Sequence, residues 1–88
     1  MLRIDIPSQD ITLRSIEEYQ IPSPPNGTDT EINGDVVLLF EDEEEAVAYL
    51  DVLEDHAAEL DNDAPEKHLI NALVSTITND EFVQAYLQ

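Results

Sequence analysis

Cysteine is absent from this chain of 88 residues, and glycine and basic residues are scarce. Without cysteine there is neither a disulfide framework nor a thiolate metal site. Stability must therefore come from apolar packing, alone or with a partner or a second copy. No apolar run approaches the ~18 residues that a membrane span needs. Residues 1–10 resemble neither a signal peptide nor an Arg-rich transit peptide, so we expect a cytoplasmic protein.

The shortage of basic residues excludes two kinds of partner. Arg3, Arg14 and Lys67 stand against 21 acids, and the formal net charge is −18. Neutralisation of phosphates by Lys and Arg is the main source of nucleic-acid affinity, so direct binding of DNA or RNA is excluded. Anionic membrane surfaces are excluded for the same reason. The charge favours a partner that carries a basic surface.

Glycine occurs only at positions 27 and 34. A phosphate-binding loop needs several glycines before a helix, so none is expected here. The hydrophobic fraction of 42% argues against intrinsic disorder despite the charge. We expect one domain over residues 1–88, with a single core.

The first part of the chain has the alternation of β-strands. Leu2, Ile4 and Ile6 alternate with polar residues until Pro7-Ser8 interrupts the pattern. A second alternation, through Ile11 and Leu13, predicts another strand over 10–16. Residues 17–29 hold three of the five prolines and an Asn-Gly pair, which predicts a flexible loop.

A hairpin is predicted around Asn33-Gly34. This pair tolerates the positive φ angles of a type I′ turn, and β-forming residues flank it on both sides. We expect residues 28–32 to pair with 35–40. Val36 to Phe40 is continuously apolar, which predicts a strand that is central in the sheet.

Helices are predicted over the second half, from about 43 to 87. Acids at 41–45 suit the first turn of a helix over 43–60. A second helix follows, with Asp63 as N-cap and Pro65 in its first turn. The expected buried positions are Ala46, Val47, Tyr49, Leu50, Leu53, Ala57 and Leu60 in the first helix and Leu69, Ile70, Leu73, Val74 and Ile77 in the second.

A short last helix is predicted by a cap at Thr78 with Glu81 three residues later. The last two helices could also form one bent helix. The apolar positions Phe82, Val83, Tyr86 and Leu87 favour core packing over a dimer face. Strands followed by helices predict an α+β fold, in which two or three C-terminal helices pack on one face of a small antiparallel sheet.

Catalytic patterns are missing. There is no Cys, and Lys67 lies among acids at a helix start. His56 and His68 lie twelve residues apart, which does not fit the i, i+4 spacing of a zinc site on one helix. We therefore expect surface histidines, no enzyme, no cofactor and no metal. The serines, which occupy no recognisable nucleophile motif, are Ser8, Ser15, Ser23 and Ser75.

Residues 29–41 come close to a calcium loop. Asp29, Glu31 and Asn33 occupy positions one, three and five of the EF-hand pattern, with Gly34 at six. Position twelve requires a bidentate Glu, but Phe40 stands there. A hairpin explains the Asn-Gly pair without an ion.

The main feature of the sequence is its acidic stretch. Residues 41–66 hold twelve Asp or Glu and no Lys or Arg, whereas 67–88 hold only two acids. Asp51, Asp55 and Glu59 recur every four residues, about 6 Å apart along a helix, with Glu54 beside them. Each neighbouring pair repels by ~0.7 kcal/mol in unscreened water. Folding does not call for this repulsion, so the asymmetry indicates a functional face.

In size, charge and α+β layout the chain resembles the small acidic inhibitors of phages and mobile elements. These are anti-restriction proteins, anti-CRISPR proteins and uracil-DNA glycosylase inhibitors, which block nucleic-acid enzymes by imitating DNA. The resemblance implies a non-enzymatic inhibitor of a basic, nucleic-acid-handling protein. The acids that would then replace phosphates are Glu41, Asp42, Glu43, Glu44, Glu45, Asp51, Glu54, Asp55, Glu59, Asp61 and Asp63.

Other interpretations remain open. An immunity protein or antitoxin would also cover a basic nuclease site, but with aromatic anchors in its acidic patch, where Tyr49 is the only aromatic residue. An assembly subunit or homodimer would use an apolar interface. A halophilic host would spread acids over the whole surface, whereas here they cluster, and the chain keeps eight Ile and ten Leu. The plainest alternative is a solvated helix face.

Overall fold

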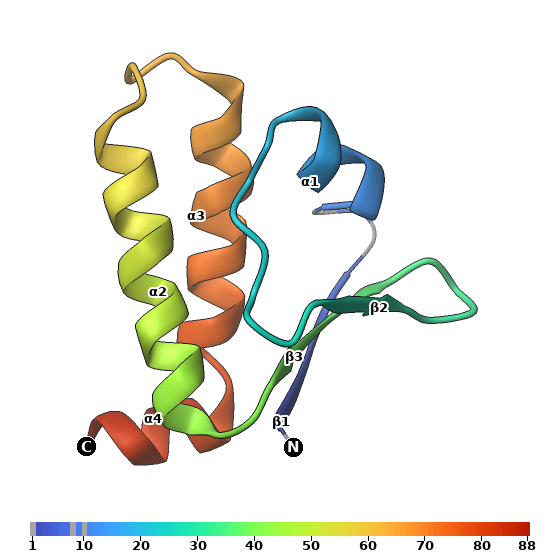
Figure 1. Ribbon diagram of the computed structural model, residues 1–88, viewed down its shortest axis with the longest axis vertical. Helices are drawn as coiled ribbons and strands as arrows, with labels where there is room; N and C mark the ends of the chain where they lie inside the picture. Colours follow the sequence, from blue (N-terminus) through green and yellow to red (C-terminus); the bar gives the residue numbers. More distant parts are fainter. Residues whose placement is uncertain (1, 8, 10) are drawn as a thin grey trace.

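A three-stranded antiparallel sheet packs against C-terminal helices in the computed structural model, which describes residues 2–7, 9 and 11–88 (Figure 1). The predicted α+β fold is confirmed. The elements in chain order are β1 (Leu2–Ile6), α1 (Leu13–Glu18), β2 (Thr28–Thr30), β3 (Val36–Phe40), α2 (Glu43–Ala58), α3 (Pro65–Thr78) and α4 (Glu81–Leu87).

Strand β3 is the centre of the sheet, as its apolar run predicts. It pairs antiparallel with β1, placing Leu2 opposite Phe40, and with β2 on its other side, placing Thr30 opposite Val36. Strand β1 ends at Ile6, just before the predicted interruption at Pro7-Ser8. Ser8 lies outside the described residues.

The β2–β3 hairpin is confirmed, but it is shorter than predicted, since Thr28–Thr30 pairs with Val36–Leu38, and its predicted type I′ turn is wrong. The backbone N–H of Gly34 donates to the carbonyl of Glu31 at 2.9 Å, and the N–H of Glu31 donates to the carbonyl of Asp35 at 2.9 Å. Gly34 has φ 93°, whereas Asn33 does not have a positive φ. These contacts fit a three-residue loop that needs only one left-handed residue.

The strand predicted over 10–16 is wrong, because this segment enters the short helix α1. Its N-cap is Thr12, whose Oγ1 accepts a hydrogen bond from the N–H of Ser15 at 3.1 Å. Ile11 lies just before α1 and Ile16 lies within it, and both are buried. The apolar spacing that resembled the alternation of a strand therefore belongs to the start of a helix. Asp10, the first residue of the predicted strand, lies outside the described residues.

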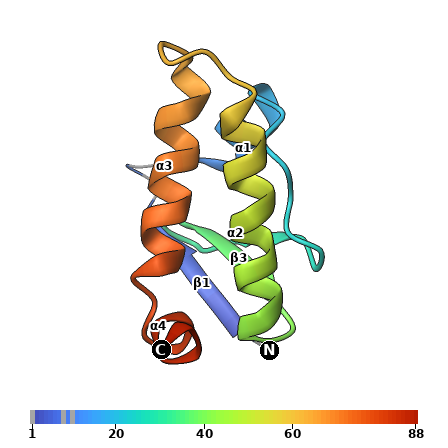
Figure 2. The same cartoon turned by 90° about the vertical axis from the view of Figure 1, so that its left-hand side faces the viewer.

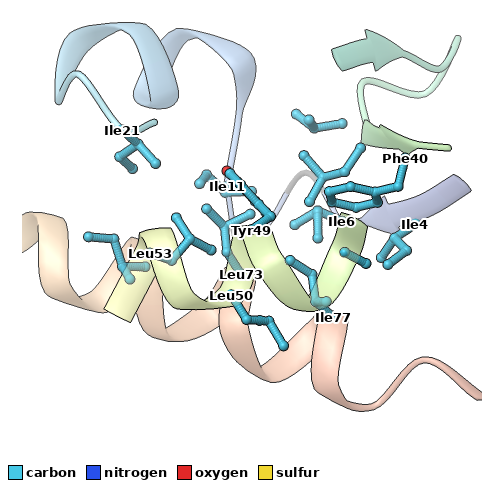
Figure 3. Close-up of a cluster of buried hydrophobic side chains, with 14 of the residues drawn as sticks. Ile4, Ile6, Ile11, Ile21, Phe40, Tyr49, Leu50, Leu53, Leu73 and Ile77 are labelled. Carbon is cyan, nitrogen blue, oxygen red and sulfur yellow. The ribbon is translucent and has the colours of Figure 1, made fainter. Parts of the chain in front are cut away.

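Helices α2 and α3 run antiparallel and cover one face of the sheet (Figure 2). Their predicted inner faces are confirmed in part: Leu53, Leu73 and Ile77 are fully buried, whereas Val47, Ala57, Leu60, Leu69 and Val74 are only partly buried against the core. Figure 3 shows these side chains meeting those of β1 and β3 in one cluster. The buried set that helices α2 and α3 contribute is Ala46, Tyr49, Leu50, Leu53, Ile70, Leu73 and Ile77.

Two predicted helix caps are displaced along the chain. The N-cap of α3 is Ala64 rather than Asp63, and it has no side-chain hydrogen bond, although Pro65 does begin the helix as predicted. The N-cap of α4 is Asp80 rather than Thr78, and its carboxylate accepts from the N–H of Phe82 at 3.0 Å. Helices α3 and α4 are therefore two separate helices.

The proline-rich segment is attached to the core at two points. Glu17 and Glu18 belong to α1 and residues 28–29 to β2, which shortens the predicted loop. The side chain of Ile21 is buried. The Tyr49 hydroxyl donates to the carbonyl of Pro22 at 2.6 Å. Helix α2 thus holds this segment against the core.

Helix α4 contradicts the expectation that its apolar residues join the core. Only Val83 is buried in this fully described helix. Phe82, Tyr86 and Leu87 are 55%, 51% and 52% exposed. The helix lies against α2 and α3 and buries Val83, while its three largest apolar side chains remain half-exposed.

Candidate functional site

The acids of α2 lie opposite its buried face. Consecutive helical residues are about 100° apart, so the buried residues Tyr49, Leu50 and Leu53 determine which direction faces outward. The outward direction carries an acidic ridge, which we define as Glu44, Asp51, Asp55 and Glu59, all exposed. Glu54 flanks the ridge and is also exposed.

No basic side chain neutralises these acids. None of the eleven predicted binding acids forms an ion pair within residues 2–7, 9 and 11–88. Arg3 instead pairs with Glu31 at 3.0 Å, next to the sheet. Lys67, the base nearest in sequence, donates to the amide oxygen of Asn62 at 3.2 Å. The ridge therefore presents its full negative charge to solvent.

Two of the predicted binding acids also support the fold. Asp42 is the N-cap of α2, and its Oδ1 accepts from the N–H of Glu45 at 3.0 Å. Glu45 accepts in turn from the side-chain amide of Asn26 at 2.7 Å and from the N–H of Glu41 at 3.2 Å. These contacts join the start of α2 to the loop before β2. Asp42 and Glu45 therefore have structural roles that do not depend on a binding partner.

The remaining predicted acids extend the charge beyond both ends of α2. Glu41 and Glu43 lie at its start, and Asp61 and Asp63 lie in the exposed turn before α3. That turn is closed by the N–H of Ala64, which donates to the carbonyl of Asp61 at 3.0 Å. The structure thus places the predicted acids in a strip along one helix and its two flanks, rather than in a single cluster.

A shallow hollow that the sequence did not predict opens at the start of α2. It has a volume of about 240 Å³ and is lined by Leu2, Glu41, Asp42, Glu43 and Phe82. The lining comes from the starts of β1, α2 and α4, which the fold brings to the same end of the molecule (Figure 1). No local pattern could have revealed this site, because its parts are far apart in the sequence.

The hairpin tip forms a second hollow, of about 390 Å³. Asp5, Glu31, Ile32, Asn33 and Asp35 line it. Ile32 is fully exposed at the tip, and Glu31 is the partner of Arg3 in the ion pair. This hollow lies away from the acidic ridge, beside the sheet.

Other kinds of site find little support. Among the described residues, no group of three or more His, Asp or Glu is placed to hold a metal ion. The segment that resembles a calcium loop is the β2–β3 hairpin. His56 is half-buried on α2 and His68 is exposed on α3. No helix in the described part of the chain is long and apolar enough to cross a membrane.

Tyr49, the only aromatic residue of the acidic stretch, belongs to the core. Its ring lies 5.6 Å from that of Phe40, centroid to centroid. Burial raises the pKa of the Tyr49 hydroxyl above its ordinary value. Tyr49 is therefore not available to anchor a partner.

Comparison of the chain with protein-family models, with curated proteins and with solved structures found no match.

Proposed function

We propose that this protein is a non-enzymatic, cytoplasmic inhibitor that binds a basic, nucleic-acid-handling protein and blocks it by presenting carboxylates in place of phosphates. One observation supports the proposal above all others. The acidic ridge is exposed, carries no basic partner within the described residues and lies on a helix whose opposite face is packed into the core.

The charge density of α2 is comparable with that of a nucleic-acid strand. From Glu43 to the C-cap Glu59 the chain holds six acids besides the hydrogen-bonded Glu45 over about 24 Å, or roughly one carboxylate per 4 Å. One strand of a DNA duplex carries one phosphate per ~3.4 Å of axis, and the whole duplex one per ~1.7 Å. The helix therefore imitates one strand rather than both.

A fixed ridge also favours tight binding. Leu53 and Tyr49 hold α2 against the sheet and the 19–27 segment. The helix is therefore already ordered before a partner binds. Association costs less when the binding surface is already ordered. The same charges on a disordered tail would carry a larger entropic cost.

A second candidate function is an immunity-like or antitoxin-like inhibitor of a toxic nuclease. Its specific support is the exposed pair Phe82 and Tyr86, because aromatic anchors dominate many inhibitor interfaces. The hollow brings Phe82 beside Glu41 and Glu43, so an aromatic anchor does adjoin the acidic stretch. Both candidates require a basic partner, and they differ in whether nucleic acid competes for the same surface.

The test is an affinity capture from nuclease-treated bacterial lysate, washed with and without excess duplex DNA. The proposal predicts capture of a nucleic-acid enzyme that the DNA displaces. Capture of a nuclease that DNA does not displace would favour the immunity-like function. Capture of no basic protein would contradict both.

Matched variants show whether the ridge causes the capture. Asp51→Lys with Asp55→Lys reverses two exposed ridge charges and should abolish capture without unfolding the domain. Asn71→Lys with Ser75→Lys places lysines at the same spacing on the exposed face of α3 and should leave capture largely intact. The reversal raises the net charge by four units and the α3 control by two, so a loss in the control about half that of the reversal would show that only the net charge matters.

A further inference from the structure

The hollow at the start of α2 combines apolar and acidic groups in a way that the ridge does not. Leu2 and Phe82 supply its apolar surface, and Glu41, Asp42 and Glu43 supply three carboxylates. Helix α4 and the first turn of α2 lie side by side here in both views (Figures 1 and 2).

Its size excludes most small-molecule ligands. Pockets for drug-sized ligands usually have volumes of ~300–1,000 Å³ and are mostly apolar. At about 240 Å³, open and rich in acid, this hollow fits a single long side chain. The occupant must also match the charge, because three carboxylates and no basic side chain line the hollow among the residues that the structure describes.

We propose that the hollow receives an arginine side chain from the basic partner. This inference rests on the proposed function and adds the residue that the partner inserts. The methylene stem of arginine would pack on Leu2, while its guanidinium stacks on the ring of Phe82 and bonds the carboxylates of the rim. Its planar fork suits both an aromatic face and a carboxylate, whereas lysine offers only a point charge.

The exposure of Phe82 supports this assignment. A phenylalanine ring that is 55% exposed keeps a free face for a cation. Tyr86, one helical turn further along α4 and 51% exposed, extends the aromatic surface away from the hollow. An arginine in the hollow therefore meets an aromatic ring and carboxylates together.

A second copy of this chain is a poor occupant. It would offer three bases against 21 acids, and Arg3 is already paired with Glu31. Two copies that met at this surface would also bring their carboxylates together. Charge complementarity therefore selects a basic partner over a homodimer.

The inference can be tested with peptides before any partner is known. Three capped tripeptides, acetyl-Gly-Arg-Gly-amide and its Lys and Gln counterparts, would be titrated into the full chain and followed by amide chemical shifts. The Arg peptide should shift the amides of Leu2, Glu43 and Phe82 in a saturable way and bind more tightly than the Lys peptide. The Gln peptide should shift none of them. Equal binding of the Arg and Lys peptides, or shifts spread evenly along α2, would overturn the inference.

Paired variants distinguish the contribution of the Phe82 ring to Arg-peptide binding from the contribution of overall negative charge. Phe82→Ala should weaken Arg-peptide binding about two- to fivefold, the range expected for a cation–π contact at an exposed site. Tyr86→Ala, the control on the same helix, should leave it unchanged. Glu43→Gln should weaken binding, whereas Asp55→Asn, with the same change in net charge on the ridge, should not. If Phe82→Ala and Tyr86→Ala behave alike, the inference is wrong.

Failure of the inference would be distinguishable from failure of the proposed function. If Phe82→Ala binds the captured, DNA-displaceable enzyme with the wild-type dissociation constant, while the ridge reversal at Asp51 and Asp55 abolishes binding, the arginine inference is wrong and the proposed role of the ridge stands. If the Arg peptide binds the hollow but the chain captures no basic protein, the proposed function fails and with it the partner's arginine.

Discussion

Helices α2 and α3 are alike on the inside and unlike on the outside. Both are amphipathic, of similar length, and pack fully buried side chains into the same core, represented by Leu53 and Leu73. Six of the 16 residues of α2 are acids, whereas Glu66 is the only acid among the 14 residues of α3. The exposed positions of α3 are instead neutral, as at Asn71 and Ser75.

Folding therefore does not require the acidic face of α2. Helix α3 shows that a neutral outer face is sufficient for the same packing. On α2, the repeated like charges subtract ~0.2–0.5 kcal/mol per i, i+4 pair. Substitutions on the buried inner faces should therefore change stability more than substitutions on the outer faces.

The inner faces should contribute equally to stability. Leu53→Ala on α2 and Leu73→Ala on α3 each remove a fully buried side chain. Each should lower the free energy of unfolding by about 2–5 kcal/mol, since the lost packing leaves a cavity. Urea denaturation measures both, and a cost below about 1 kcal/mol for either one would show that its helix is not packed as described.

Helix α2 should differ from α3 in holding the 19–27 segment. Tyr49→Phe removes the hydrogen bond to the carbonyl of Pro22 and should cost about 1–1.5 kcal/mol. Leu50→Met, which changes a neighbouring buried residue without touching a polar group, is the control, and this volume-conserving change should cost less than ~1.5 kcal/mol.

The same tyrosine predicts a pH dependence. Burial raises the pKa of Tyr49 in the folded chain above its unfolded value. Above the ordinary value of about 10 the unfolded chain therefore loses a proton that the folded chain keeps, and stability falls as pH rises. Tyr49→Phe should flatten this decline in denaturation curves between pH 9 and 11, and an unchanged slope would contradict the burial of the hydroxyl.

The two helix starts should respond in opposite directions. Asp42→Ala removes the N-cap of α2 and should cost about 1 kcal/mol, whereas Asp42→Asn keeps a capping side chain and should be nearly neutral. Ala64→Ser supplies the side chain that the N-cap of α3 lacks and should raise the melting temperature. A gain from Asp42→Ala would show that repulsion outweighs the cap.

The outer faces should give the smallest effect. Asp51→Asn with Asp55→Asn relieves the two repulsive i, i+4 pairs Asp51–Asp55 and Asp55–Glu59 and should stabilise the domain by ~0.4–1 kcal/mol at low salt. Added salt should reduce the gain because both groups are exposed. Asn71→Asp with Ser75→Asp creates one such pair on α3 and should cost less, because Lys67 lies four residues before position 71 and attracts the new carboxylate. If both variants changed stability in the same direction, charge repulsion would not distinguish the outer faces of α2 and α3.

Sequence patterns correctly predicted the parts of the fold that depend on residues close together in the chain. The apolar run Val36–Phe40 identified the central strand, and 3.6-residue spacing identified the inner faces of α2 and α3. The segment over 10–16 was mistaken for a strand because two apolar residues fit either period, and the cap at Thr12 decides for a helix.

The site was only partly predictable for the same reason. Helical spacing was enough to place Asp51 and Asp55 on one exposed face. It could not show that Phe82 stays exposed, since an apolar helix position does not reveal whether a core is there to receive it. The hollow depends on the meeting of three chain segments, which only the tertiary structure provides.

The most direct test of the central claim is the affinity for the captured enzyme as a function of salt. Three proteins are compared: wild type, Asp51→Asn with Asp55→Asn, and Asn71→Lys with Ser75→Lys, where both variants change the net charge equally. If the ridge binds, the first variant loses affinity and has a weaker salt dependence, whereas the α3 variant stays close to wild type. If both variants lose affinity equally, or neither does, the ridge is only a solvated helix face.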